Sequence, residues 1–144
     1  MRPSHWLRRQ HGKELFATDV EAAIRETEGP LERAQAMICA HVESVLRDEA
    51  MHTTTFAEMQ TLSEARRSEV FKLRRAHEDL IRGVLLDAQK AGALRNDIDV
   101  KALCLALLGL MNRSTVWYRR NGRLSPNQVG RLMGVLFLSG AGAS

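Results

Sequence analysis

Apolar positions recur every three or four residues through most of this chain, which is the period of an amphipathic α-helix. No stretch alternates apolar and polar residues as a half-buried strand does. The pattern therefore predicts an all-α fold. Helices are expected at about residues 13–27, 31–47, 63–91, 98–119 and 125–139, with a short, less regular one after the capping pair Thr55 and Glu58.

Local signals mark the ends of these helices. Gly29 and Pro30 stop the first helix and begin the second, since proline suits a first helical turn. Gly92 is expected to cap the longest helix, and either Asp97 or Asp99 begins the next one. The last helix has an N-cap serine, a first-turn proline and a capping-box glutamine: Ser125, Pro126 and Gln128.

The last two helices are unusually apolar. Every position from Ala102 to Met111 is apolar or glycine, so this helix needs cover on nearly all sides. The final helix has two interior glycines, each about 1 kcal/mol less favourable than alanine, which indicates a close helix approach. We expect a homodimer with a four-helix bundle at its interface, the alternative being the core of a monomer. The expected interface residues are Ala102, Ala106, Gly109, Gly130, Met133, Gly134 and Phe137.

Composition restricts the class of protein. The 144 residues are 44% hydrophobic and 26% charged, values typical of a globular domain. The net charge of +4 comes from the ends of the chain: residues 1–13 and 100–144 contain no acid, so a continuous basic groove for nucleic acid is not expected. Cys39 and Cys104 lack CxxC spacing, which favours a reducing cytoplasm. The longest apolar run is too short for a membrane span.

No catalytic motif is present, and we predict neither an enzyme nor a cofactor. The five histidines lack metal-ligand spacing, so no metal site is expected. His77 lies on the inward stripe of its helix, where it is either a satisfied core residue or a polar anchor in a ligand cavity. Asn112 interrupts an apolar face in the same way. Trp117 ends that helix, with closing the core as its simplest role.

Two segments resemble a known family. Residues 92–99 (GALRNDID) and residues 117–126 (WYRRNGRLSP), with the apolar helix between them, resemble the C-terminal region of TetR-family transcriptional regulators. The resemblance covers about residues 63–138, and the start of the helix at Pro30 is also similar. It implies a TetR C-terminal-like helical bundle that dimerises and binds a small apolar effector. The 117–126 junction is similar to members that sense acyl-CoA thioesters or lipid-like metabolites. The effector-binding residues that we expect are His41, Phe56, Met59, His77, Asn112 and Trp117.

Members of this family begin with a three-helix DNA-binding head. Residues 1–12 are expected to be a basic remnant or a disordered segment, and residues 13–144 the helical ligand-binding and dimerisation domain. DNA binding is therefore expected only if a missing head is restored, or as a weak, salt-sensitive contact of the basic N-terminal residues. The alternative function is a helical interaction module that heterodimerises with a full-length regulator.

Overall fold

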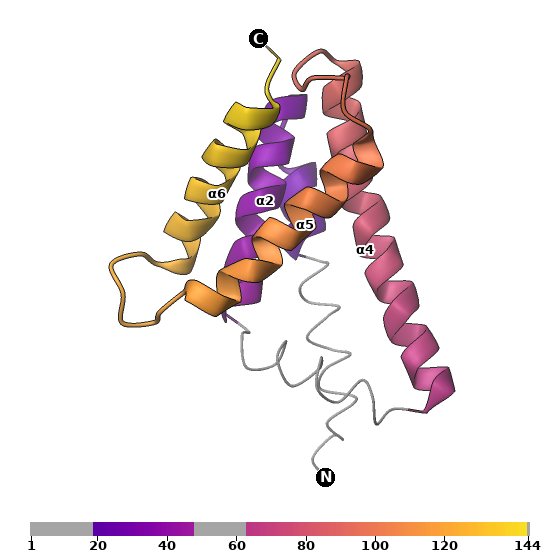
Figure 1. The fold of residues 1–144 in the computed structure, drawn as a ribbon, viewed down its shortest axis with the longest axis vertical. Coiled ribbons are helices and arrows are strands. Elements are labelled where there is room, and N and C mark those ends of the chain that lie inside the picture. The colour runs from indigo at the N-terminus through magenta and orange to yellow at the C-terminus, as the bar shows by residue number, and fades with distance from the viewer. Residues whose placement is uncertain (1–18, 48–62, 144) are drawn as a thin grey trace.

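The computed structural model describes residues 19–47 and 63–143, and most of these residues are helical (Figure 1). Four helices are complete: α2 (Pro30–Arg47), α4 (Glu64–Lys90), α5 (Val100–Trp117) and α6 (Pro126–Ala141). Residues 19–25 add a short helical stretch before α2. The all-α prediction is confirmed. The short helix expected after Thr55, with Phe56 and Met59, lies outside the described residues, as does the start of the first helix.

Capping signals in the sequence locate the ends of these helices to within two residues. Gly29 adopts a left-handed φ of 87°, which places Pro30 at the first position of α2. Asp99, rather than Asp97, is the N-cap of α5, and its carboxylate accepts a hydrogen bond from the Ala102 amide at 3.1 Å. The capping box of α6 forms as expected, with reciprocal bonds between Ser125 and Gln128 at 3.2 and 2.8 Å.

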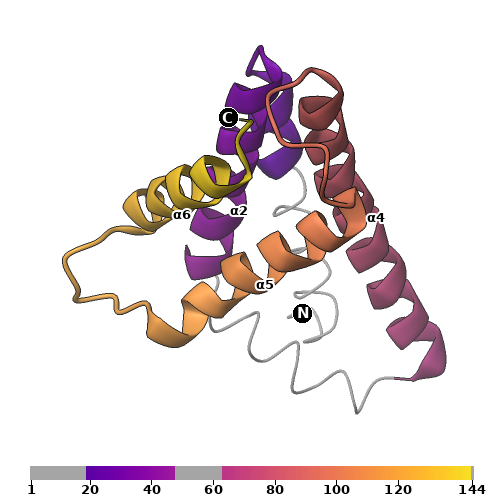
Figure 2. The same cartoon turned by 45° about the horizontal axis from the view of Figure 1, so that its top comes forward.

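Helix α2 lies at the centre of the fold and contacts each of the other three helices. Helix α6 runs beside it, α5 crosses it, and α4 flanks it on another side (Figures 1 and 2). The N-terminal half of α4 extends beyond the body formed by the other helices. The elements that are far apart in sequence therefore meet around the middle of α2.

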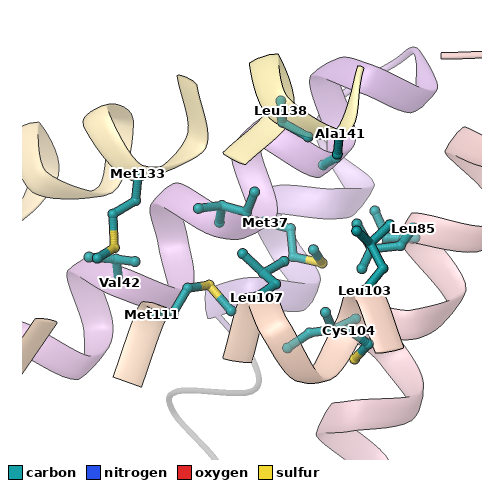
Figure 3. Packing of buried hydrophobic residues seen from close by; sticks show 14 of the residues in the cluster. Met37, Val42, Leu85, Leu103, Cys104, Leu107, Met111, Met133, Leu138 and Ala141 are labelled. Carbon is teal, nitrogen blue, oxygen red and sulfur yellow. The ribbon is translucent and has the colours of Figure 1, made fainter. Parts of the chain in front are cut away.

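The apolar stripes of the four helices meet in one core (Figure 3). Met37 of α2, Leu85 of α4 and Leu107 of α5 are fully buried there. Met133 and Leu138 attach α6 to the same cluster. Burial of one such side chain contributes about 1.5–3 kcal/mol, so the shared core holds the helices together.

The glycines of α6 serve a contact within the chain, which corrects one of the arguments for a dimer. A Cβ atom at Gly130 would lie 2.8 Å from the backbone oxygen of Cys39 on α2, and one at Gly134 would collide with the side chain of Gln35. Both glycines and Met133 are buried inside the protomer. They allow α6 to approach α2 closely, so they are not on the outer side of the helix, where a second chain could meet them.

Backbone hydrogen bonds join the C-terminal end of α6 to the loop between α4 and α5. Helix α4 ends with Gly92 in a left-handed conformation, and the amide of Ala93 donates to the carbonyl of Ala88 at 2.9 Å. The amide of Arg95 then donates to the carbonyl of Ala141 at 2.9 Å, and Leu94 and Gly142 form an isolated antiparallel bridge. This loop therefore holds the C-terminal end of α6 in place.

Candidate polar site in the helical core

Three polar side chains from three different helices meet at the edge of the core: His41 is buried, His77 is partly buried and Asn112 is exposed. His41 lies in α2, His77 in α4 and Asn112 in α5. His41 Nδ1 is 2.9 Å from His77 Nε2, and His41 Nε2 is 3.3 Å from Asn112 Oδ1. The two imidazole rings are stacked, with their centroids 5.0 Å apart and an angle of 23° between their planes. Both ring nitrogens of His41 are therefore hydrogen-bonded, and this residue joins the other two.

His41 is only 2% exposed, although histidine is seldom fully buried. Its neighbours on α2, Met37, Val42 and Val45, are buried apolar residues. A buried imidazole is tolerated when its polar atoms are bonded, because an unbonded buried nitrogen loses about 1–3 kcal/mol of hydration. The hydrogen bonds to His77 and Asn112 supply this compensation.

Acidic residues beside the histidines in the sequence form ion pairs with arginines of their own helices. Glu43, two residues after His41, pairs with Arg47. Asp79, two residues after His77, pairs with Arg82 at 2.7 Å. The hydrogen bonds that join the cluster are made by two imidazole rings and an amide rather than by these carboxylates. The cluster of His41, His77 and Asn112 is therefore suited to binding and orienting a polar group.

The structure brings together three of the six residues expected to bind an effector: His41, His77 and Asn112. Trp117 lies elsewhere, at the C-terminal end of α5, with 46% of its surface exposed. Phe56 and Met59 lie outside the described residues. The direct bond between the two histidines was not foreseen. Its only signal in the sequence was that each histidine lies on or beside an apolar helical stripe.

The two cysteines are poor candidates for chemistry. Burial raises the pKa of the Cys39 thiol, and the nearby carboxylate of Glu43 raises it further. Burial also raises the pKa of the Cys104 thiol. Because the thiolate is the reactive form, both residues are weak nucleophiles at neutral pH.

Metal binding and membrane insertion have no support among the described residues. Within residues 19–47 and 63–143, no group of three histidine, cysteine or acidic residues is placed to hold a metal ion. Of the helices in those ranges, none is both long and apolar enough to cross a membrane.

The outer sides of α5 and α6 expose large apolar side chains. Of the residues expected at a dimer interface, Ala102, Ala106 and Gly109 are exposed on α5, while Phe137 of α6 is partly buried against the core. We call the exposed leucines and valines of these two helices the outer apolar residues: Leu105, Leu110, Val116, Leu132, Val135 and Leu136. In a single chain, each of them is at least 43% exposed.

Comparison with known proteins identifies the family. The sequence model of the tetracyclin repressor-like, C-terminal domain matches residues 27–141, most of the chain. This chain belongs to the TetR family. The all-α fold and the resemblance seen in residues 92–126 agree with this assignment. No curated protein gave a sequence match to the chain.

Several solved structures, among them a TetR-family transcriptional regulator, share its fold. PfmR from Thermus thermophilus superposes with a TM-score of 0.84 at 23% identity, covering 94% of this chain and 73% of PfmR. KstR2, a ketosteroid transcriptional regulator of Mycobacterium tuberculosis, has a TM-score of 0.77 at 27% identity, covering 90% and 68% of the two chains. AibR, solved with isovaleryl coenzyme A and operator DNA, has a TM-score of 0.77 at 21% identity, covering 93% and 73%.

Proposed function

We propose that this TetR-family chain senses a small, largely apolar effector and dimerises through α5 and α6. The observation that carries the sensing proposal is the cluster of His41, His77 and Asn112. Small-molecule sites in proteins are mostly apolar and contain a few polar groups that orient the ligand. A hydrogen-bonded cluster that three helices contribute, with His41 buried against apolar residues of the core, is a group of this kind.

The effector class that we propose is an acyl-CoA or another lipid-like metabolite. Apolar burial contributes about 25 cal/mol per Å², so an acyl chain or a sterol-like skeleton supplies most of the binding energy. AibR was solved with isovaleryl coenzyme A, and KstR2 is described as a ketosteroid regulator, which supports this class by analogy. The role proposed is regulatory: the effector binds one arrangement of the helices more tightly and raises its population.

Native mass spectrometry and thermal shift measurements test the sensing proposal. We expect a bound metabolite in the purified protein, or a raised Tm with at least one member of an acyl-CoA and lipid panel. His41→Leu should weaken that binding at least tenfold. Lys101→Leu, at an exposed position of α5, is the matched control and should leave it unchanged. If no metabolite is found and no panel member shifts the Tm, the sensing proposal is wrong.

The dimer proposal rests on the outer apolar residues. Large apolar patches on a protein surface usually mark an interaction site, because water contact with them is unfavourable. The replacement Leu136→Glu should convert the dimer to a monomer in sedimentation experiments, since it puts a charge into the proposed interface. Phe71→Glu is the control: Phe71 is 47% exposed, but it lies on α4. A wild-type chain that sediments as a monomer at micromolar concentration contradicts this proposal.

The same outer apolar residues fit the alternative function, in which this chain forms a heterodimer with a full-length regulator. A subunit-exchange experiment distinguishes the proposed homodimer from this heterodimer. Mixing the chain with a related TetR-family regulator should leave the operator gel shift of that regulator unchanged if the chain only pairs with itself. A weakened gel shift together with a mixed dimer would favour the alternative.

A further inference from the structure

A groove lies along the N-terminal half of α4, the part of this helix that extends beyond the rest of the fold (Figures 1 and 2). Its volume is about 420 Å³, which is within the range of small-molecule sites. Three of the side chains that line it are cationic and one is aromatic. The lining residues are Glu64, Arg67, Ser68, Phe71, Lys72 and Arg75.

Helical spacing places the aromatic residue of this groove between two arginines. Arg67 comes four residues before Phe71 and Arg75 four residues after it, so the three side chains follow one line along α4. At a rise of 1.5 Å per residue, this line is about 12 Å long. Phe71 is 47% exposed, so one side of its ring is open for stacking. An exposed ring between cations is an arrangement that binds a base and its phosphates together.

The charges of the groove are not balanced. Within the part of the chain that the structure describes, two of its three cations, Lys72 and Arg75, form no ion pair. Asp79 lies four residues after Arg75, which is the spacing of a helical ion pair, but it pairs with Arg82 at 2.7 Å. Glu64 is the one acidic residue among those that line the groove. The groove therefore has a net positive charge and attracts an anion.

We propose that this groove is a second ligand site, which binds a phosphorylated nucleotide. The base stacks on Phe71, and Lys72 and Arg75 donate charge-assisted hydrogen bonds to the phosphates. The hydroxyl of Ser68 and the carboxylate of Glu64 are suited to the hydroxyl groups of the sugar. An inorganic phosphate uses the cations but not the ring, and an uncharged apolar molecule uses the ring but not the cations. A nucleotide is the class of ligand that uses both.

This site is separate from the cluster of His41, His77 and Asn112, and it does not depend on the proposed effector. Arg75 and His77 are two residues apart in α4, so their side chains do not lie on the same side of the helix. Two sources supply the proposed ligand: a free nucleoside diphosphate and the nucleotide end of a coenzyme A thioester. Both contain an adenosine diphosphate group, and binding experiments distinguish them.

Calorimetric titration of the full chain tests the site with three probes: adenosine diphosphate, adenosine and inorganic pyrophosphate. We expect adenosine diphosphate to bind at least tenfold more tightly than adenosine, which lacks the phosphates, and than pyrophosphate, which lacks the ring. Its affinity should fall as salt is added, because exposed charges are screened. If adenosine diphosphate does not bind, or binds no more tightly than pyrophosphate, the proposal is wrong.

Titration with coenzyme A identifies the source of the nucleotide. Binding of coenzyme A at least tenfold more tightly than adenosine diphosphate supports the thioester, and equal affinities support a free nucleotide. A single-stranded oligonucleotide that binds a hundredfold more tightly than adenosine diphosphate would overturn the proposal, because this face of α4 would then be a contact for nucleic acid.

Substitutions examine the two parts of the site separately. The double variant Lys72→Gln and Arg75→Gln should bind both adenosine diphosphate and pyrophosphate at least tenfold more weakly than wild type. Phe71→Leu should weaken the binding of adenosine diphosphate and leave that of pyrophosphate unchanged. Lys90→Gln, an exposed cation in the last turn of α4, is the matched control and should change neither. The substituted side chains are exposed, so each variant should keep the Tm of wild type. Unchanged binding of adenosine diphosphate in the double variant would refute the site.

Discussion

The two sides of α2 are packed by different means. Toward α6 the contact depends on the absence of a side chain at Gly130, where a Cβ atom would lie 2.8 Å from the backbone oxygen of Cys39 on α2. Toward α4 and α5 the contact contains His41 and its hydrogen bonds to His77 and Asn112. The α2–α6 contact is determined by close steric fit. The contact of α2 with α4 and α5 includes polar groups whose donor and acceptor roles can change.

This difference bears on the stability of the fold and on the effector recognition proposed above. A close backbone contact has one arrangement, because any added atom collides with main chain. A buried hydrogen-bonded cluster is less favourable for stability than apolar packing, and it offers groups that can orient a ligand. The two kinds of packing predict losses of stability of different size on substitution, and two measurements compare them. A third measurement concerns the loop after α4.

The largest effect is expected on the α6 side. Gly130→Leu places a side chain against the backbone of Cys39, which cannot move aside without separating α6 from α2. We expect a loss of about 3 kcal/mol or more in the free energy of unfolding, measured by urea denaturation. Gly83→Ala is the matched control: space around its Cβ is open, so it should gain about 0.5–1 kcal/mol. Equal stabilities for wild type and Gly130→Leu would show that the close approach is not needed.

A smaller effect is expected at the cluster. His41→Leu removes a partner of His77 and Asn112 and should lower the free energy of unfolding by about 1–3 kcal/mol. The double variant His41→Leu and His77→Leu should lose less than the sum of the single variants, with a coupling of about 0.5–3 kcal/mol. Denaturation of the four proteins in the cycle measures this coupling. Strict additivity would mean that the bond between the rings contributes nothing.

The smallest effect is expected in the loop after α4, far from either side of α2. The hydrogen bond from Arg95, 2.7 Å long, holds the pKa of Asp97 below its usual range. A lowered pKa in the folded state stabilises the protein above the unfolded pKa of about 3.9, and this contribution is lost as the pH falls through the folded value. Asp97→Asn should thus lower Tm slightly at pH 7, with the difference disappearing below about pH 4. If the difference in Tm between wild type and Asp97→Asn persisted in acid, it would not come from the lowered pKa of Asp97.

Helix positions were predictable because the signals that define them are local. The Ser125 capping box and the proline at the start of α2 act within one helical turn, so the sequence alone locates them. The choice between Asp97 and Asp99 was not settled by such signals. Both are acidic residues before an apolar run, and only the folded loop shows that Asp97 is engaged by Arg95.

Contacts between helices were harder to predict. A pair of glycines four residues apart indicates a close approach, but the spacing does not say which helix approaches. Gly130 and Gly134 meet α2 of the same chain, although a second chain was expected there. The sequence singled out His77 and Asn112 because each interrupts an apolar stripe, and their role in effector binding stays a prediction. The bond between His41 and His77 depends on the rotation of two helices, which periodicity does not determine.

The hydrogen bonds between residues 93–95 and residues 141–143 affect local unfolding of the protein. Terminal turns of a helix usually fray, since their last carbonyl groups lack partners within the helix. In α6, the carbonyl of Ala141 accepts from Arg95, and the amide of Ala143 donates to Ala93 at 3.4 Å. Hydrogen exchange at the amides of Arg95 and Ala143 then requires the loop to detach, so residues 93–95 and residues 141–143 would exchange as one cooperative unit.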